Sequence, residues 1–213
     1  MKALLFINGE PPEKLPSFLG YTCVACTDGA FRYLKNQGFP LQKLKYISGD
    51  FDSLSDEELL GFEEKKIFTP DQNKTDFEKT LEILLRKNIN AVDVYGGSGK
   101  EMDHFLGNLT VAHRYTKFLS LKFYDRYSEY FFVPKNFILG GVKDLIISLY
   151  PFPLAKEVTT RGLHWNLNKE DLTVNTKVSI RNYATSDEIE ITYTEGSLLF
   201  FKEKTGKIRK SII

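Results

Sequence analysis

The first half of the chain alternates short apolar runs with segments of helical pattern. Apolar residues at helical spacing follow Thr75, which forms an S/T-x-x-E capping box with Glu78, and Ser55 forms the same pattern with Glu58, so we expect a helix after each. The apolar runs indicate buried strands and are Lys2–Ile7, Thr22–Cys26, Lys45–Ser48, Lys66–Phe68, Ala91–Tyr95 and Leu121–Asp125. Strands that alternate with helices predict an α/β layer with a mostly parallel sheet.

The pattern changes near residue 126, beyond which Gly, Pro and Asn turns separate strand-like segments and no helix is indicated. The strand-like segments are Tyr130–Val133, Leu145–Leu149, Leu172–Ile180 and Glu188–Tyr193. In the last of them apolar and polar residues alternate, which is typical of a half-buried antiparallel strand. The fold class is therefore α/β plus all-β, with an α/β domain over residues 1–126 and an antiparallel β-sandwich or barrel over residues 127–213.

Charge and hydropathy narrow the classes of partner. Lys and Arg total 29 and Asp and Glu total 28, so a net charge of +1 provides no overall field that would attract nucleic acid or an anionic membrane. No apolar stretch approaches the roughly 20 residues that span a bilayer, and the run Ala3–Ile7 is too short for a secretion signal. We expect a cytoplasmic protein with no nucleic-acid or membrane partner. The basic segment Lys202–Lys210 is expected to be a solvated edge strand protected by its lysines.

Two cysteines form a C-x-x-C pair, Cys23 and Cys26. Such a pair can carry redox chemistry or half of a zinc site, but the chain has no further cysteine to complete a four-sulfur site. Redox pairs usually begin a helix, whereas this pair lies in an apolar, strand-like run. We interpret both cysteines as residues of a buried strand.

The first acidic loop has the sequence S-G-D-F-D-S at residues 48–53, directly after an apolar run. If this segment stays extended, Asp50 and Asp52 point to one side while Phe51 points into the core. Two converging carboxylates repel each other unless a cation lies between them, and Mg²⁺ takes oxygen ligands of this kind. The alternative is a loop in which the aspartates cap backbone amides.

A second acidic loop, D-Q-N-K-T-D at residues 71–76, also lies between a strand and a helix. Ligands of open α/β sheets gather at the carboxyl ends of the strands, so the two loops should share one crevice. Thr75 and Asp76 stand at a helix N-terminus, whose free amides can hold a phosphate, although capping alone also explains Thr75.

The third loop, G-G-S-G-K-E-M-D-H at residues 96–104, is rich in glycine. Its glycines would let backbone amides approach a phosphate, and Asp103 adds a third carboxylate to the rim. His104 by itself is as well explained by a structural role. Near the N-terminus Asp28 follows another strand, where capping of a short helix accounts for it without a ligand.

The single tryptophan of the chain, Trp165, lies in the segment T-T-R-G-L-H-W at residues 159–165. A lone tryptophan is usually a core residue. The alternative is an aromatic platform for a flat or cationic ligand, because indole is the best partner for a cation–π contact.

The order of these motifs resembles that of the thiamine pyrophosphokinase family over nearly the whole chain. The motifs are D-G in a first helix turn, G-D-F-D-S, D-x-x-x-T-D, G-G-x-G with D-H, then T-R-G-L-x-W-x-L and a late Asn. The resemblance implies a catalytic α/β domain (1–126) that binds ATP and metal, and a β-sandwich domain (127–213) that binds thiamine and forms a homodimer. It also implies Mg²⁺ as cofactor, and thiamine diphosphate and AMP as products.

Candidate roles follow from the resemblance, motif by motif. Catalytic candidates are Asp50, Asp52, Asp71 and Asp76, and the metal-ligand candidates among them are Asp50, Asp52 and Asp76. The ATP-binding candidates are Lys74, Thr75, Gly96, Gly97, Gly99, Asp103 and His104. The thiamine-binding candidates are Asp28, Gln72, Trp165 and Asn182, with Trp165 contributed by the partner subunit. The resemblance does not say which carboxylate removes the proton of the thiamine hydroxyl.

The chain departs from the family pattern at three places. Lys100-Glu101 replaces a common Gly-Arg before the D-H pair, which puts a carboxylate where a phosphate-binding guanidinium is expected. Arg181 replaces the serine that usually precedes the late Asn, close to where a cationic thiazolium would bind. Thr27 and Ala30 flank Asp28-Gly29 where A-D-G-G is more common. Two alternatives stay open. A metal-dependent phosphohydrolase could use the same acidic crevice, and Glu101 and Arg181 leave room for a non-enzymatic thiamine-binding regulatory protein.

Overall fold

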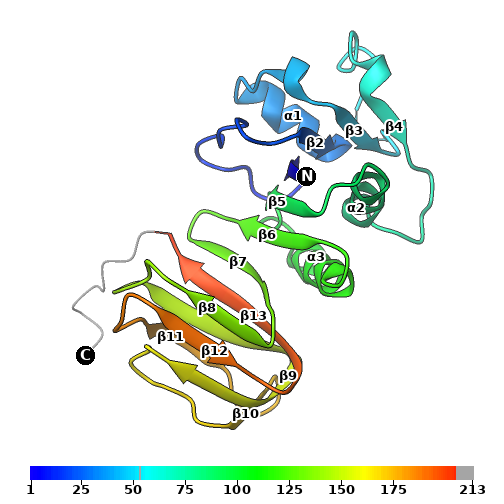
Figure 1. Ribbon diagram of the computed structural model, residues 1–213. Coiled ribbons are helices and arrows are strands. Elements are labelled where there is room, and N and C mark those ends of the chain that lie inside the picture. Colours follow the sequence, from blue (N-terminus) through cyan, green and yellow to red (C-terminus); the bar gives the residue numbers. More distant parts are fainter. Residues whose placement is uncertain (53, 205–213) are drawn as a thin grey trace. The chain divides into compact units, whose positions relative to one another are not determined.

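The computed structural model describes residues 1–52 and 54–204, which form two compact units. Unit one comprises Met1–Arg126, and unit two begins at Tyr127 (Figure 1). None of the helices in the described ranges is long and apolar enough to cross a membrane.

Unit one contains a sheet in which every strand pair is parallel. Its strands are β1 (Lys2–Phe6), β2 (Cys23–Thr27), β3 (Tyr46–Gly49), β4 (Lys66–Phe68), β5 (Ala91–Tyr95) and β6 (Ser120–Tyr124). They lie in the order β4-β3-β2-β1-β5-β6, so the chain runs outward from β1 to β4 and then returns to β5 on the other side of β1. The parallel sheet expected from the apolar runs is confirmed.

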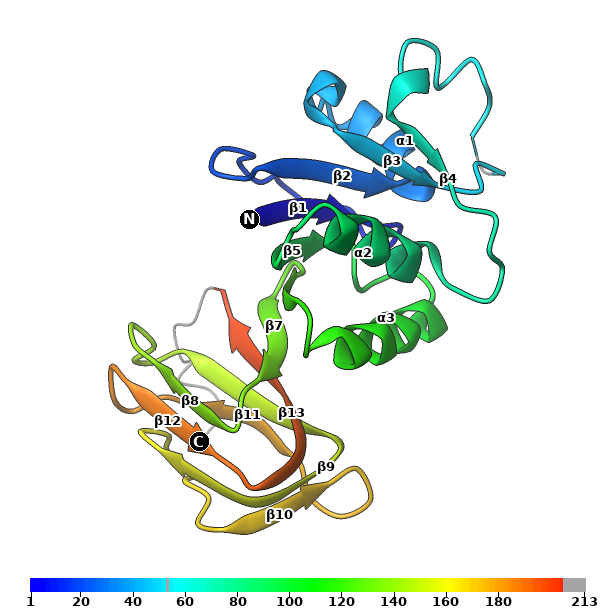
Figure 2. The same ribbon diagram turned by 45° about the vertical axis from the view of Figure 1, so that its right-hand side comes forward.

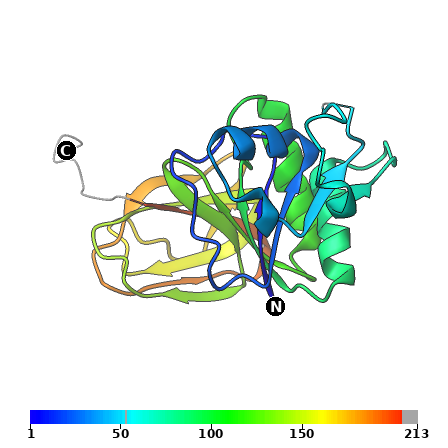
Figure 3. The same ribbon diagram turned by 90° about the horizontal axis from the view of Figure 1, so that it is seen from above.

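Helices cover both faces of this sheet. They are α1 (Asp28–Asn36), α2 (Asp76–Arg86) and α3 (Met102–Tyr115), with two short 3₁₀ turns, η1 (Leu41–Lys43) and η2 (Glu63–Lys65). Ile47 packs in the apolar cluster that contains α1, whereas its neighbour Ser48 is hydrogen-bonded to Thr80 of α2 at 2.6 Å. Because successive side chains of a strand point to opposite faces, α1 and α2 lie on opposite sides of the sheet, as Figure 2 shows. The segment between β1 and β2, dark blue in Figure 3, contains no helix.

The C-x-x-C pair is part of the buried sheet, as expected. All five residues of β2 are buried, and Cys23 and Cys26 are free thiols within it. Burial raises the pKa of the Cys23 thiol to about 11 and raises that of Cys26 as well. Thiols that stay protonated are poor nucleophiles and poor metal ligands, so the pair is structural.

The two capping boxes have different outcomes. Thr75 caps α2 by accepting a hydrogen bond from the Glu78 amide at 3.2 Å. Ser55 and Glu58 make reciprocal bonds, but only turns follow them before η2, so the expected helix is absent from this part of the described chain. The capping bonds do not suffice here, because the turns end at Gly61, where φ is +83°, a left-handed conformation that stops a helix.

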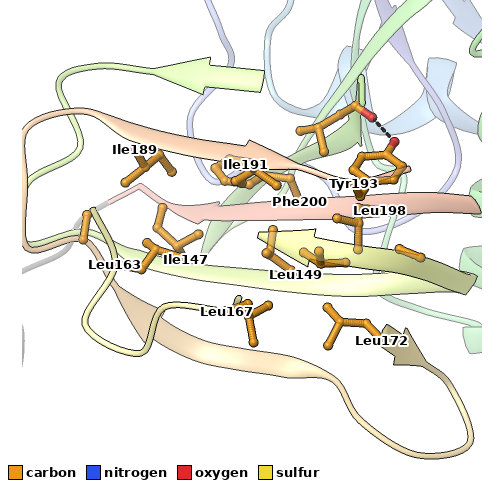
Figure 4. Close-up of a cluster of buried hydrophobic side chains, with 14 of the residues drawn as sticks. Ile147, Leu149, Leu163, Leu167, Leu172, Ile189, Ile191, Tyr193, Leu198 and Phe200 are labelled. Atoms are coloured by element: carbon orange, nitrogen blue, oxygen red, sulfur yellow. Dashed lines mark hydrogen bonds between the residues drawn. The ribbon is translucent and has the colours of Figure 1, made fainter. Parts of the chain in front are cut away.

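Unit two consists of antiparallel strands around one apolar core (Figure 4). The strands are β7 (Ser128–Val133), β8 (Asn136–Leu139), β9 (Ile146–Arg161), β10 (Glu170–Thr173), β11 (Ser179–Tyr183), β12 (Ile189–Thr192) and β13 (Glu195–Glu203). Strand β9 organises them, because it pairs with β13 and β12 along one edge and with β11 and β10 along the other. The Tyr193 hydroxyl donates to the Val133 carbonyl at 2.7 Å and closes one end of the core. The expected antiparallel β class is confirmed.

Three features of the strands differ from the expectation. Strand β9 does not stop near Leu149 but continues to Arg161 through two prolines, and the expected strand Leu172–Ile180 is divided by a turn into β10 and β11. Strand β13 is not an edge strand, because it pairs with β7 and β9, and Lys202 forms a 2.7 Å ion pair with Glu129 of β7. The rest of the basic segment, residues 205–210, lies outside the described residues.

Candidate active site

A crevice of about 500 Å³ lies in unit one, lined by the loops that follow the carboxyl ends of its strands. These loops leave β1, β2, β3, β4 and β5, and they meet where the strand order reverses between β1 and β5. Such a reversal is the usual ligand site of an open α/β sheet, because the loops on its two sides diverge and leave a gap.

Most of the candidate residues predicted in unit one line this crevice. Those that do are Asp28, Asp50, Asp52, Gln72, Lys74, Thr75, Asp76, Gly97, Gly99, Asp103 and His104, whereas Asp71 and Gly96 do not. Within the described residues, no group of three or more His, Cys, Asp or Glu side chains is arranged to hold a metal ion. The protein groups alone therefore do not form a closed metal cage.

Asp28 is the most buried carboxylate of the crevice, with 5% of its surface exposed. Burial and the nearby charges of Asp76 and Asp50 raise its pKa, although two backbone amides oppose the shift. One of these amides belongs to Phe51, at 2.9 Å, so Asp28 holds the loop that carries Asp50. Gly49 makes room for this contact, because a Cβ there would lie 2.2 Å from the carboxylate of Asp28.

The G-D-F-D-S loop is not extended. Phe51 has a φ of +62°, in the left-handed region, and its ring packs against the α1 core cluster. The expectation of an extended segment is wrong at this residue, because the hydrogen bond from the Phe51 amide to Asp28 favours a turn. Asp50 and Asp52 nevertheless both line the crevice, and the amide of Gln72 donates to Asp50 at 3.4 Å. Ser53 lies outside the described residues.

Asp71 has a local role in the loop after β4. Its carboxylate accepts hydrogen bonds from the backbone and side-chain nitrogens of Asn73, at 2.9 and 3.2 Å. These bonds, the backbone one above all, lower the pKa of Asp71. The pattern is that of an Asx turn, in which the aspartate shapes the loop.

The sequence does not single out Lys79, a cation in the wall of the crevice. Its side chain is 7% exposed, and its Nζ lies 2.8 Å from both the Asp76 carboxylate and the Thr69 carbonyl oxygen. Lys79 therefore neutralises part of the negative charge of the crevice and fixes Asp76. The i, i+3 spacing of the two residues at the start of α2 is a signal that could have revealed the pair. Lys74, in the loop before α2, forms a 2.6 Å ion pair with Glu82 of that helix.

The glycine-rich loop is shaped by the segment after β1. Gly9 and Glu10 donate backbone hydrogen bonds to the carbonyls of Gly96 and Ser98, both at 2.8 Å. A Cβ at Gly96 would lie 2.1 Å from the Ile7 carbonyl oxygen, so the close approach of these two backbones requires a glycine there. Packing thus explains Gly96, while Gly97 and Gly99 also line the crevice.

The two departures in this loop both lie in the crevice wall. Lys100 donates to the Asn8 side chain at 2.9 Å, so a positive charge is present although the expected guanidinium is not. Glu101 lies 3.7 Å from the ring of His104, and both side chains are largely exposed. Asp103 accepts a hydrogen bond from the His104 amide at 2.9 Å.

The remaining candidates lie in unit two, where Trp165 is exposed over 58% of its surface. This exposure argues against the core interpretation and favours a platform. The indole lies edge-on to the rings of His164 and Tyr183, with centroids 4.5 and 5.7 Å away, and those two rings stack on each other at 4.6 Å. Asn182 is buried beneath them and bonds to the backbone of Trp165. Arg181 is exposed and adopts a φ of +58°.

Two family models match the chain. Residues 19–124 match the catalytic domain of thiamin pyrophosphokinase, and residues 141–198 match its vitamin B1 binding domain. Together they cover more than half of the chain, and each falls within one of the two units.

Individual proteins are similar over nearly their full length. The thiamine pyrophosphokinase of Bacillus subtilis (strain 168) is 23% identical over 215 residues, which is 95% of this chain and 99% of that protein. A solved thiamin pyrophosphokinase family protein of Enterococcus faecalis has a TM-score of 0.81 and 22% identity, with 96% of this chain and 100% of that chain covered. The thiamin pyrophosphokinase structure from Geobacillus thermodenitrificans has the same TM-score and 21% identity, with 96% and 98% covered. The catalytic-domain match contains most of the crevice, and the vitamin B1 binding match contains the exposed Trp165. This protein therefore belongs to the thiamine pyrophosphokinase family.

Proposed function

We propose that the crevice of unit one is where this enzyme carries out the reaction of its family, the transfer of a diphosphoryl group from ATP to thiamine. The thiamine hydroxyl oxygen attacks the β-phosphorus of ATP, the bond from that phosphorus to the oxygen it shares with the α-phosphorus breaks, and AMP leaves. The hydroxyl proton passes to a carboxylate of the crevice. The observation that carries the proposal is the gathering of six acidic side chains with Lys79 in one crevice. Positioning and charge neutralisation account for most of the catalysis of phosphoryl transfer.

Mg²⁺ is the cofactor that this donor set suits. Asp28 has a raised pKa partly because Asp76 and Asp50 are close, and a cation would relieve that repulsion. The residues that would hold the ion are Asp50, Asp52 and Asp76. Two of these carboxylates would bind it together with phosphate oxygens and water. When bound, the ion would neutralise charge on the transferred group.

The other groups of the crevice divide between positioning and charge. Lys79 fixes Asp76, and Asp28 fixes the loop of Asp50. Lys74, Thr75, Gly97, Gly99, Asp103 and His104 are proposed to bind ATP, and Lys100 adds a positive charge beside them. Gln72, which already contacts Asp50, is proposed to touch thiamine together with Asp28.

Thiamine is also proposed to meet the aromatic face of unit two. The flat pyrimidine and the cationic thiazolium both suit an exposed indole. In a homodimer, the partner subunit's Trp165 would cover the thiamine bound in the crevice of the first subunit. Light scattering tests this arrangement, and an active monomer at assay concentration would refute it. We further propose that the enzyme acts in the cytoplasm, where ATP is supplied, without a nucleic-acid or membrane partner.

The direct test is incubation of the protein with ATP, Mg²⁺ and thiamine, followed by detection of AMP and thiamine diphosphate. Formation of both in equal amounts supports the proposal. Release of inorganic phosphate without thiamine would instead indicate a phosphohydrolase. Thiamine binding without AMP formation would indicate a regulatory protein.

A further inference from the structure

Asn182 has the environment of a residue that holds the backbone. Its side chain is buried, with 3% of the residue exposed. The side-chain nitrogen donates to the Trp165 carbonyl at 2.8 Å, and the side-chain oxygen accepts from the Trp165 amide at 3.2 Å and from the Tyr183 amide at 2.9 Å. One amide side chain thus bonds both backbone groups of the exposed tryptophan.

A local irregularity of β11 aims Asn182 inward. The register of β11 against β9 shifts between Ser179 and Asn182, and Arg181 lies in the left-handed region with a φ of +58°. The Arg181 amide donates to the Ser148 side chain at 2.9 Å instead of to the backbone of β9. Irregularities of this kind redirect a side chain at a functional site. Here the side chain that gains the inward position is Asn182.

The hydrogen bonds from Asn182 to the backbone of Trp165, here called the clamp, hold a residue whose side chain is exposed. Trp165 lies in a loop, its indole is edge-on to two neighbouring rings, and 58% of the residue is exposed, so its side chain is not enclosed by a core. An exposed ring that can turn freely must be ordered when a ligand binds, which weakens binding. The backbone bonds from Asn182, with a further bond from the His164 amide to the Tyr183 carbonyl at 2.9 Å, order the loop before any ligand arrives.

We propose that Asn182 is a positioning residue that does not contact thiamine itself but holds Trp165 so that its indole is preorganised for a flat, cationic heteroaromatic ring. The inference rests on the proposed role of Trp165 as the thiamine wall. It changes the direct contact that the family resemblance implies for Asn182 into an indirect one.

A double-mutant cycle with full-length protein tests the indirect role. Asn182→Asp keeps the side-chain volume and both acceptor contacts but cannot donate to the Trp165 carbonyl. It should raise the thiamine KM about fivefold and leave kcat and the ATP KM within about twofold. In a Trp165→Ala background the same substitution should change the thiamine KM by less than about twofold, because its effect passes through the indole. An equal fivefold effect in both backgrounds would overturn the proposal and indicate direct contact.

Fluorescence of the substrate-free protein tests the clamp without reference to thiamine. Trp165 is the single tryptophan, so its time-resolved anisotropy reports its own motion. Asn182→Asp and Asn182→Ala should both speed the local depolarisation of the indole. Thr185→Ala is the control, because it removes a 3.2 Å bond to the Gly162 carbonyl of the same loop and should leave that motion unchanged. If Trp165 does not bind thiamine, the cycle shows no effect while the anisotropy still changes. Unchanged anisotropy in both Asn182 variants would overturn the clamp itself.

Discussion

The crevice of unit one and the aromatic cluster of unit two form binding surfaces by opposite means. In the crevice, several loops bring carboxylates together, and burial of Asp28, with the nearby charges of Asp76 and Asp50, raises the pKa of that residue. In unit two, neutral rings lie at the surface and a single buried amide holds their backbone. Like charges that lie close together lower the stability of the ligand-free protein. Exposed rings on a fixed backbone lower that stability little. Changes in the crevice should therefore alter turnover and stability together, and changes in the cluster should alter thiamine binding alone.

The largest effect is expected at the acidic loop of the crevice. Asp50→Asn and Asp52→Asn should each lower kcat by about 100-fold or more, because each removes a charge that faces the reacting phosphates. The fold should persist, since both side chains lie on a loop that is not buried. Steady-state kinetics and circular dichroism measure the two effects. Asp56→Asn, at an exposed carboxylate nearby, is the control. Activity within about threefold of the parent, roughly 0.7 kcal/mol of barrier, would remove Asp50 and Asp52 from the catalytic set.

Lys79 tests whether the crevice depends on a built-in cation. Lys79→Met keeps the length of the side chain but leaves Asp76 without its partner, which should lower kcat by about tenfold. Because the partly buried Asp76 carboxylate and the Thr69 carbonyl both lose their partner, the midpoint of thermal unfolding should fall as well. Kinetics and thermal denaturation measure both. Loss of stability with unchanged kcat would reduce Lys79 to a structural role.

Trp165 tests the opposite behaviour in unit two. Trp165→Ala should raise the thiamine KM about 5- to 30-fold, since a desolvated cation–π contact contributes about 1 to 2 kcal/mol. The ATP KM should change much less. Because the indole is exposed, the free energy of unfolding should barely change, in contrast to the about 3 to 5 kcal/mol lost when a buried tryptophan is truncated. A large loss of stability with an unchanged thiamine KM would restore the core interpretation.

The pH dependence of stability should report the burial of Asp28 and the carboxylates near it. Its folded pKa is raised above the ordinary value of 3.8, so the folded protein binds this proton more tightly than the unfolded chain does. The contribution of Asp28 to the stability of the parent should therefore be lost as the pH rises from about 3.8 through the folded pKa. The difference in unfolding free energy between Asp28→Asn and the parent should shift in favour of the variant over that range. Urea denaturation between pH 3.5 and 7 measures it, and a difference independent of pH would contradict the assigned shift.

The sequence predicted the fold well where burial alone decides the structure. Every strand of unit one was expected within a residue or two, and the signal is clearest in β1 and β2, whose buried residues form an uninterrupted apolar run. The helix expected after Ser55 is absent because capping bonds are local, and Gly61 adopts a left-handed conformation only a few residues later. The length of β9 was missed because its two prolines resemble chain breaks, although a strand can accommodate proline where the nitrogen has no ladder bond to make.

The site was predictable in position but not in detail. Carboxylates and glycines after successive strands indicated a crevice, and the topology brings most of them to its wall. The requirement for glycine at Gly96 comes from a backbone 89 residues earlier in the chain, which no local pattern reveals. Likewise Asn182 bonds to Trp165, which lies 17 residues earlier in the chain. This bond depends on a register shift of β11 that no sequence pattern predicts.

The smallest effect is expected at Arg181, where unit two carries local backbone strain. A non-glycine residue in the left-handed region costs about 1 kcal/mol, and glycine avoids that cost. Arg181→Gly should therefore have an unfolding free energy about 1 kcal/mol higher than Arg181→Ala, which keeps the Cβ but removes the same charged group. Comparing these two variants by urea denaturation separates the backbone effect from loss of the guanidinium. Both variants should keep a thiamine KM within about twofold of the parent, because Arg181 is exposed and Asn182 remains in place. Equal stabilities would mean that the irregular part of β11 around residue 181 relaxes to another conformation when Arg181 is replaced. A glycine variant with a raised thiamine KM would mean that the strained backbone, and not only the Asn182 side chain, holds the tryptophan.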